Sequence, residues 1–104
     1  MGLAIFENYS QTKEGTNYSP LIVHTSQVHC FDLMCKWINN NSFSNVEINK
    51  DFFEIYAEAD SFEITISVGE EESNALLNVS VYGKTGKTRK KLKEYLSQIT
   101  NYLK

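Results

Sequence analysis

The fold is decided by residues 46–82, which read VEINKDFFEIYAEADSFEITISVGEEESNALLNVSVY. Apolar and polar residues alternate along four segments of this stretch, most clearly at 62–68 and also at 53–58, 77–82 and, more briefly, 46–49. A period of two is the pattern of a β-strand with one face buried and the other in water. One-sided alternation is typical of antiparallel sheets. The stretch therefore predicts four antiparallel strands.

Two amphipathic helices are predicted, one on each side of these strands. The apolar stripe of the first consists of Val28, Phe31, Cys35 and Ile38, with Met34 and Trp37 beside them. Thr25 or Ser26 is expected to cap this helix, and Asn39–Asn41 to end it. The stripe of the second consists of Leu92, Tyr95, Leu96, Ile99, Tyr102 and Leu103. Both stripes recur at the three- and four-residue spacing of a helix with one buried face.

The beginning of the chain carries weaker signals. Pro20 is the only proline. We expect it to open a short strand at Leu21–His24, because proline is tolerated at the first residue of a strand and not in its interior. Ala4–Phe6 is expected to form an edge strand or a strap, and the polar Gln11–Ser19 a loop.

The predicted order is strand, helix, four strands, helix (β-α-β-β-β-β-α). Short turns at Asp60-Ser61 and Glu70–Asn74 make consecutive strands antiparallel neighbours. Both helices need the same apolar sheet face, which predicts a two-layer α+β sandwich. We expect a single domain over 1–104, with 1–19 as a strap or edge strand and loop and 20–104 as the core. The element order resembles one repeat of the TATA-binding protein, in topology only, and such a resemblance carries no function.

Composition indicates a globular cytoplasmic protein. The chain has 104 residues, 41% of them hydrophobic, and no apolar run approaches the roughly 20 residues that span a bilayer. The apolar run Leu3–Phe6 has no basic flank, so no signal peptide is predicted. Cys30 and Cys35 lie on one helix and point apart, so free, buried thiols of a reducing compartment are expected.

Charge is divided along the chain. Residues 84–104 carry seven Lys or Arg and one Glu, whereas residues 1–83 carry three basic and twelve acidic residues. Within 46–72 there are nine acids against Lys50 alone. The sequence therefore predicts an acidic sheet followed by a basic helix.

The string Gly83–Thr88 (GKTGKT) lies between the last strand and the last helix. A phosphate-binding P-loop needs four residues between its first glycine and the Gly-Lys-Thr, which would place that glycine at Val81, inside the strand. Nucleotide hydrolysis is therefore disfavoured. The string is expected to be a strand-to-helix turn whose Thr85 or Thr88 caps the helix. A small anion or ligand site at that helix N-terminus remains an alternative, formed by Lys84, Thr85, Gly86, Lys87 and Thr88.

Other chemistry has little support in the sequence. The spacing of His24, His29, Cys30 and Cys35 matches no common zinc site, so no metal or cofactor is expected. Paired glutamates on an open sheet face have no dry pocket that would raise a carboxyl pKa, so no enzyme activity is predicted. The same acidic face would repel phosphates, whereas the basic Lys84–Lys93 cluster would attract them but has no interleaved aromatic residues outside the buried stripe. Nucleic acid is therefore disfavoured as a ligand.

The remaining feature is an acidic surface that also carries tyrosines. We expect it to occlude a basic protein partner, as an immunity protein does to a nuclease-type toxin, because acidic patches steer association with basic sites. The predicted contact residues are Glu47, Glu54, Tyr56, Glu58, Asp60, Glu63, Glu70, Glu71, Glu72 and Tyr82, with the two tyrosines as anchors. The sequence does not rank the strand glutamates against the Glu70–Glu72 turn. A homodimer joined through the tyrosine-bearing face is a further alternative.

Overall fold

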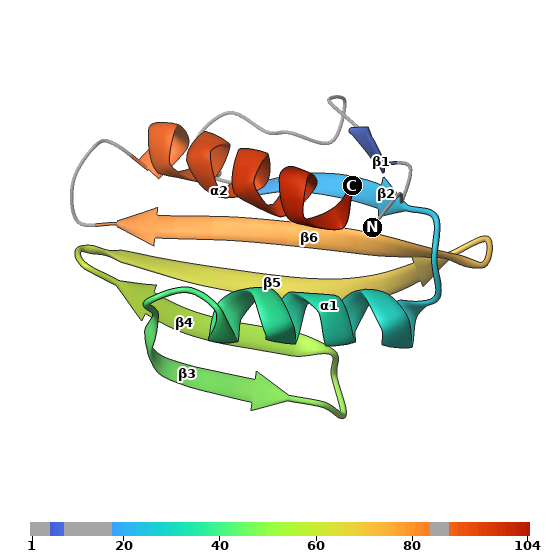
Figure 1. The fold of residues 1–104 in the computed structure, drawn as a ribbon, viewed down its shortest axis with the longest axis horizontal. Helices are drawn as coiled ribbons and strands as arrows, with labels where there is room; N and C mark the ends of the chain where they lie inside the picture. The colour runs from blue at the N-terminus through green and yellow to red at the C-terminus, as the bar shows by residue number, and fades with distance from the viewer. Residues whose placement is uncertain (1–4, 8–17, 84–87) are drawn as a thin grey trace.

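The computed structural model of the chain describes residues 5–7, 18–83 and 88–104. Its elements, in order, are β1 (Ile5–Glu7), β2 (Tyr18–Val23), α1 (Gln27–Asn39), β3 (Ser44–Asn49), β4 (Glu54–Ala59), β5 (Phe62–Glu71), β6 (Asn74–Gly83) and α2 (Thr88–Leu103). The strands form one antiparallel sheet in the order β1-β2-β6-β5-β4-β3. Both helices cover the same face of it (Figure 1). The predicted two-layer α+β sandwich is confirmed.

Strands β3 to β6 form a meander joined by short turns. β4 and β5 are connected by Asp60-Ser61, since Ala59 pairs with Phe62. β5 and β6 are ten residues each and are connected by Glu72 and Ser73, whose φ angles are 49° and 70°. Two successive positive φ values are the signature of a type I′ hairpin turn, whose twist matches that of the strands. The expected turn at 70–74 is therefore only two residues long, and the hairpin extends well beyond the last buried pair.

Proline occupies the interior of β2, which the sequence analysis did not predict. Pro20 is the third residue of the strand and pairs with Asn78 of β6, whereas β1 pairs only with Leu21–Val23. At Pro20, β2 pairs with a described strand on its β6 side only, which is the edge position where sheets tolerate proline. Most of the loop expected at Gln11–Ser19 lies outside the described residues, while Tyr18 and Ser19 belong to β2.

The alternating strand residues build the core as predicted. Every second residue in the middle of β4, β5 and β6 is buried, and the inward set is Ile55, Ala57, Ile64, Ile66, Val68, Ala75, Leu77, Val79 and Val81. The predicted stripe of α2 is confirmed, with Ile99 and Leu103 fully buried. The stripe of α1 is rotated from the prediction, because Val28 is 65% exposed while Cys30 and Leu33 are buried. Ser26 caps this helix by accepting a hydrogen bond from the His29 N–H.

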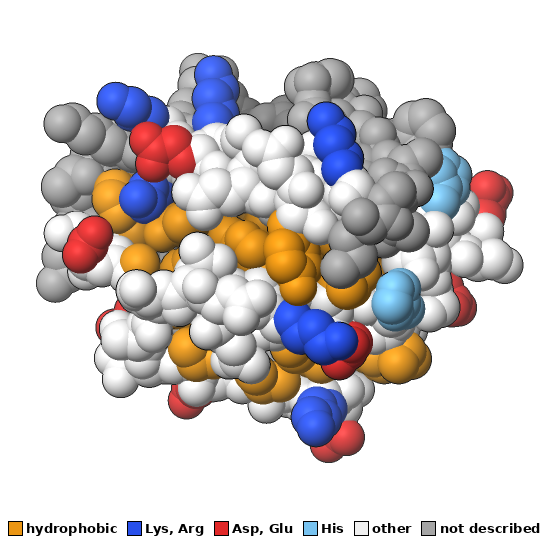
Figure 2. Space-filling view, in the orientation of Figure 1, with side chains coloured by type: hydrophobic (Ala, Val, Ile, Leu, Met, Phe, Trp, Pro, Cys, Tyr) orange, Lys and Arg blue, Asp and Glu red, His pale blue; other side chains and the backbone are white. Residues whose placement is uncertain are grey.

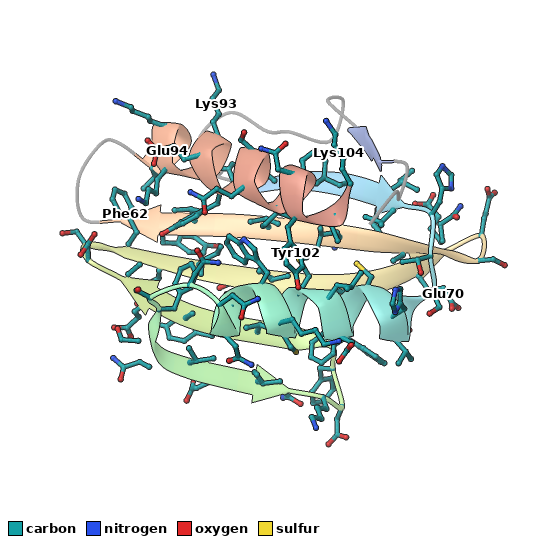
Figure 3. All side chains as sticks on the ribbon, viewed as in Figure 1. Phe62, Glu70, Lys93, Glu94, Tyr102 and Lys104 are labelled. Carbon is teal, nitrogen blue, oxygen red and sulfur yellow. The ribbon has the colours of Figure 1, made fainter. Side chains whose placement is uncertain are left out.

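An aromatic cluster joins the two helices. The Trp37 ring of α1 lies 6.0 Å from the Tyr95 ring of α2, and Phe43 lies within 5.6 Å of both. Lys91 places its ammonium over Tyr95 and Phe62, 5.1 and 5.7 Å from the ring centres. Hydrophobic side chains gather in the band between the helices (Figure 2), where Tyr102 lies (Figure 3). Neither described helix is long and apolar enough to cross a membrane.

The edge strand β3 departs from the simple alternation. Val46 and Ile48 were expected on the buried face, but they are 37% and 39% exposed because β3 lies beyond the edge of α1 (Figure 1). The register with β4 also shifts, so that Asn45 and Val46 both lie opposite Ala57. Asn45 has a φ of 49°, which identifies a β-bulge with its first residue in the left-handed region.

Candidate functional site

The sheet face opposite the helices is uncovered in the described part of the chain, and we call it the open face. Strand register arranges its side chains in three rows. The first is Asn49, Glu54, Ser67 and Asn78; the second is Glu47, Tyr56, Thr65 and Ser80; the third is Glu58, Glu63 and Tyr82. None of the six described strands contains a lysine or arginine. The glutamates of these three rows all lie on β3, β4 and β5, so the acidic side chains gather on that side of the open face.

Tyr56 is the centre of this acidic region. Its hydroxyl oxygen lies 2.7 Å from Glu63 Oε1 and 2.8 Å from Glu58 Oε2. A hydroxyl has one proton, so it donates to one carboxylate at a time and is shared between the two. These bonds, the one to Glu63 first, raise the pKa of Tyr56 well above its usual value. Tyr56 therefore stays protonated and bridges two carboxylates that would otherwise repel each other.

The bulge in β3 supplies a second donor to the same cluster. Asn45 Nδ2 donates a hydrogen bond to Glu58 Oε1 at 3.1 Å, and Ser44 Oγ donates to the Glu58 carbonyl at 3.3 Å. The bond from Asn45, followed by that from Tyr56, holds the pKa of Glu58 below its usual value. Glu58 is therefore ionised at neutral pH and fixed in direction by two donors. The left-handed backbone of Asn45 in the bulge directs its side-chain amide toward the Glu58 carboxylate.

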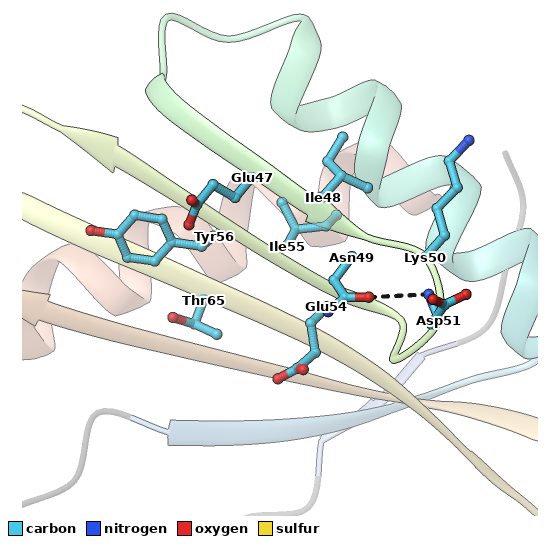
Figure 4. Close-up of a pocket in the computed structure, with 9 residues that line it drawn as sticks. All are labelled: Glu47, Ile48, Asn49, Lys50, Asp51, Glu54, Ile55, Tyr56 and Thr65. Atoms are coloured by element: carbon cyan, nitrogen blue, oxygen red, sulfur yellow. Dashed lines mark hydrogen bonds between the residues drawn. The ribbon is translucent and has the colours of Figure 1, made fainter.

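A shallow hollow lies beside Tyr56 at the β3–β4 end of the open face (Figure 4). Its volume is about 750 Å³, and its lining includes Glu47, Asn49, Glu54, Tyr56 and Thr65. The β3–β4 turn closes one side, where Asn49 Oδ1 accepts a hydrogen bond from the Asp51 N–H at 3.2 Å. Ile48, Lys50, Asp51 and Ile55 complete the lining, so the hollow has both polar and apolar surface, a net negative charge and one aromatic ring at its border.

The structure brings together six of the ten predicted contact residues. Those on the open face are Glu47, Glu54, Tyr56, Glu58, Glu63 and Tyr82. Asp60 lies in the β4–β5 turn, outside the paired rows of the open face. Glu70, Glu71 and Glu72 lie at the tip of the β5–β6 hairpin, at the opposite end of the sheet from Phe62 (Figure 3). Glu71 keeps the alternation of the open face, but it lies four residues beyond Ser67, beside the turn. The two acidic candidates therefore occupy different parts of the sheet.

Asn45 and Asn49 were missed by the sequence analysis. Asparagine is one of the few non-glycine residues enriched at positive φ, so an asparagine beside a short exposed strand is a weak signal for a bulge. Asn49 precedes Lys50-Asp51, a composition typical of a turn in which the asparagine side chain accepts a backbone N–H.

The alternative anion site lies largely outside the described residues, which exclude 84–87. Its flanking residues have packing roles. Val81, where a P-loop would need glycine, is fully buried. Gly83 pairs with Phe62, and a Cβ built on Gly83 would lie 2.7 Å from that ring. The first glycine of the string therefore leaves room for an aromatic ring, which needs no phosphate ligand to explain it.

The cysteines and histidines are dispersed. Cys30 and Cys35 are free thiols; Cys30 is buried, as predicted, whereas Cys35 is only half-buried. Burial raises the pKa of Cys30 to about 12. His24 Nδ1 lies 3.0 Å from Asn74 Oδ1, and His29 is exposed on α1. Among the described residues, no group of three or more His, Cys, Asp or Glu side chains is placed to hold a metal ion.

Comparison with known proteins returned no match to a family model, a curated protein or a solved structure.

Proposed function

We propose that this chain is a non-enzymatic binding protein whose open face docks a basic protein partner. The observation that carries the proposal is the arrangement around Tyr56. Four glutamates surround its ring: Glu47 opposite it on β3, Glu54 and Glu58 beside it on β4, and Glu63 diagonal to it on β5. No described strand carries a basic side chain. An aromatic anchor within a field of one sign is suited to a partner of opposite charge.

The arrangement has an energetic cost in the isolated protein. Glu58 and Glu63 lie directly opposite each other on β4 and β5. Like charges in such a pair destabilise a sheet, and here the Tyr56 hydroxyl offsets the repulsion only in part, since it has one proton for two carboxylates. A positively charged partner would relieve the repulsion between Glu58 and Glu63, so this repulsion in the free protein favours binding of such a partner.

The most concrete partner is a nuclease-type toxin, for which this protein would be a cytoplasmic immunity protein. Such enzymes hold a polyanionic substrate in a basic cleft, and clustered carboxylates present the same charge as phosphates. Inhibition would be by occlusion. The glutamates would steer the encounter, while Tyr56 and Tyr82, the latter 56% exposed, would pack against the cleft.

Electrostatics favours a different protein over a second copy on this face. Two open faces brought together would place the same glutamates against each other, and buried unpaired charges oppose association strongly. The partner is therefore expected to be basic and distinct from this chain.

The test is capture of partners from the native cell extract at low and high salt, followed by association kinetics with the recovered protein. The E54Q/E58Q/E63Q variant removes three charges from the open face, and the matched E70Q/E71Q/E72Q variant removes three from the hairpin tip. We expect the first to slow association by about tenfold or more at low salt, and the second by less than about threefold. Equal slowing would show that only net charge matters, and failure to recover any basic protein would refute the proposal.

A further inference from the structure

The four glutamates around Tyr56 differ in what they already bind. Glu58 and Glu63 both contact the Tyr56 hydroxyl, and Glu58 also accepts from Asn45. Glu47 and Glu54, in contrast, make no hydrogen bond or ion pair with any described residue. One pair of carboxylates therefore fixes the tyrosine, and the other pair is free to bind a ligand.

The free pair borders the hollow. Glu47 lies opposite Tyr56, and Glu54 lies opposite Asn49, so the two glutamates are diagonal neighbours across β3 and β4. Residues in such a diagonal lie roughly 7–8 Å apart, with their Cβ atoms somewhat closer, and the long glutamate side chains can therefore reach both sides of one planar cation. The hollow of about 750 Å³ opens at this point.

The Tyr56 ring is held so that one face is available. Its hydroxyl points to Glu58 and Glu63, away from Glu54, and the ring lies beside Glu47 with a face toward the open side of the sheet (Figure 4). Lys50 also lines the hollow, but its side chain extends toward α1 and away from both free glutamates (Figure 4). The protein's own nearby cation therefore does not neutralise them.

We infer that this hollow receives an arginine side chain of the basic partner, an inference that rests on the proposed function. A guanidinium group is planar, stacks on an aromatic face and donates in a fork that matches a carboxylate. Stacked on Tyr56, it donates to Glu47 on one side and Glu54 on the other, with the Thr65 hydroxyl as a further acceptor. A lysine ammonium gains the charge interaction but neither the stacking nor the two-pronged geometry.

The experiment uses tetra-arginine and tetra-lysine peptides, which have the same charge and differ in the head group. Each is titrated at low ionic strength into ¹⁵N-labelled protein, and the amide shifts map the site. We expect the arginine peptide to bind at least about fivefold more tightly, with the largest shifts at Glu47, Tyr56 and Thr65. E47Q/E54Q should weaken the arginine peptide by about fivefold or more, whereas E70Q/E71Q, with the same charge change, should leave it within about twofold.

The outcomes separate this inference from the proposed function. Equal binding of both peptides on the open face would overturn the arginine site and leave an acidic docking face in place. Shifts centred on the 70–72 hairpin, or no shifts with either peptide, would overturn both. The chain has a single arginine, Arg89, so concentration-dependent shifts of the hollow without peptide would assign it to a second copy and also refute the inference.

Discussion

Two glycines in the central hairpin should respond to alanine in opposite directions. Both lie in strands with φ outside the left-handed region, so neither is required for backbone conformation. A Cβ on Gly83 would lie 2.7 and 2.8 Å from two Phe62 ring carbons and 3.0 Å from the Thr88 methyl group. A Cβ on Gly69 would lie 3.8 Å from Leu76, an ordinary contact. Only the first substitution forces its neighbours to move.

The expected free energies follow from these distances. Overpacking a well-packed site costs about 1–3 kcal/mol, and the half-buried Phe62 can tilt, which places Gly83→Ala at about 1–2 kcal/mol. Replacing glycine by alanine also reduces the entropy of the unfolded chain, which stabilises by about 0.4–1 kcal/mol. Gly83→Ala should therefore destabilise by about 1 kcal/mol net and lower Tm by roughly 4–8 °C. Gly69→Ala should stabilise by about 0.5 kcal/mol, because the entropy effect acts there without a clash.

The assay is urea unfolding followed by circular dichroism, with thermal melts in parallel. A Phe62→Leu background removes the ring edge that the new methyl group meets, so the cost of Gly83→Ala should disappear in that background. Phe62→Leu also removes the contact between Lys91 and the Phe62 ring. That loss is present both with and without Gly83→Ala in the Phe62→Leu background, so it cancels in the difference. If Gly83→Ala stabilised the wild-type protein, or cost the same in both backgrounds, the packing explanation of this glycine would be wrong.

Two further predictions concern the tyrosine cluster and the hairpin turn. In Tyr56→Phe, Glu58 loses one of its two side-chain donors, so its pKa should rise toward the usual value while Asn45 keeps it from returning fully. Since the folded-state pKa of Glu58 is lowered, its stabilisation is present at neutral pH and disappears as pH falls through that pKa, and this acid-dependent loss should be smaller in the variant. Carboxyl ¹³C titration measures the shift, and an unchanged Glu58 pKa would contradict the bonding described here. Replacing Glu72-Ser73 by Asn-Gly, the preferred type I′ pair, should stabilise by about 1 kcal/mol in urea unfolding, whereas the reversed Gly-Asn should gain less.

The composition of the open face could be predicted from the sequence. Glu54, Tyr56 and Glu58 alternate with buried residues, and Glu63 does the same one strand later, so a period of two places all four on one side. That pattern is local, because each side chain's direction follows from its own position in the strand. The sequence did not predict that Glu58 and Glu63 bind the Tyr56 hydroxyl while Glu47 and Glu54 stay unpaired among the described residues, because this depends on which residues lie opposite each other.

The sequence by itself determined the two-layer α+β arrangement, the antiparallel meander and the buried stripe of α2, since each follows from periodicity and turn composition within a few residues. Tertiary structure alone decided the register that sets Glu47 beside Tyr56 and brings the Tyr56 hydroxyl to Glu63, seven residues away. It also decided the bulge that directs Asn45 toward Glu58. The position of α1 was decided in the same way, and because α1 does not cover β3, Val46 and Ile48 are partly exposed. Such features arise from strand pairing and layer packing between distant segments, and no local pattern encodes where two surfaces will meet.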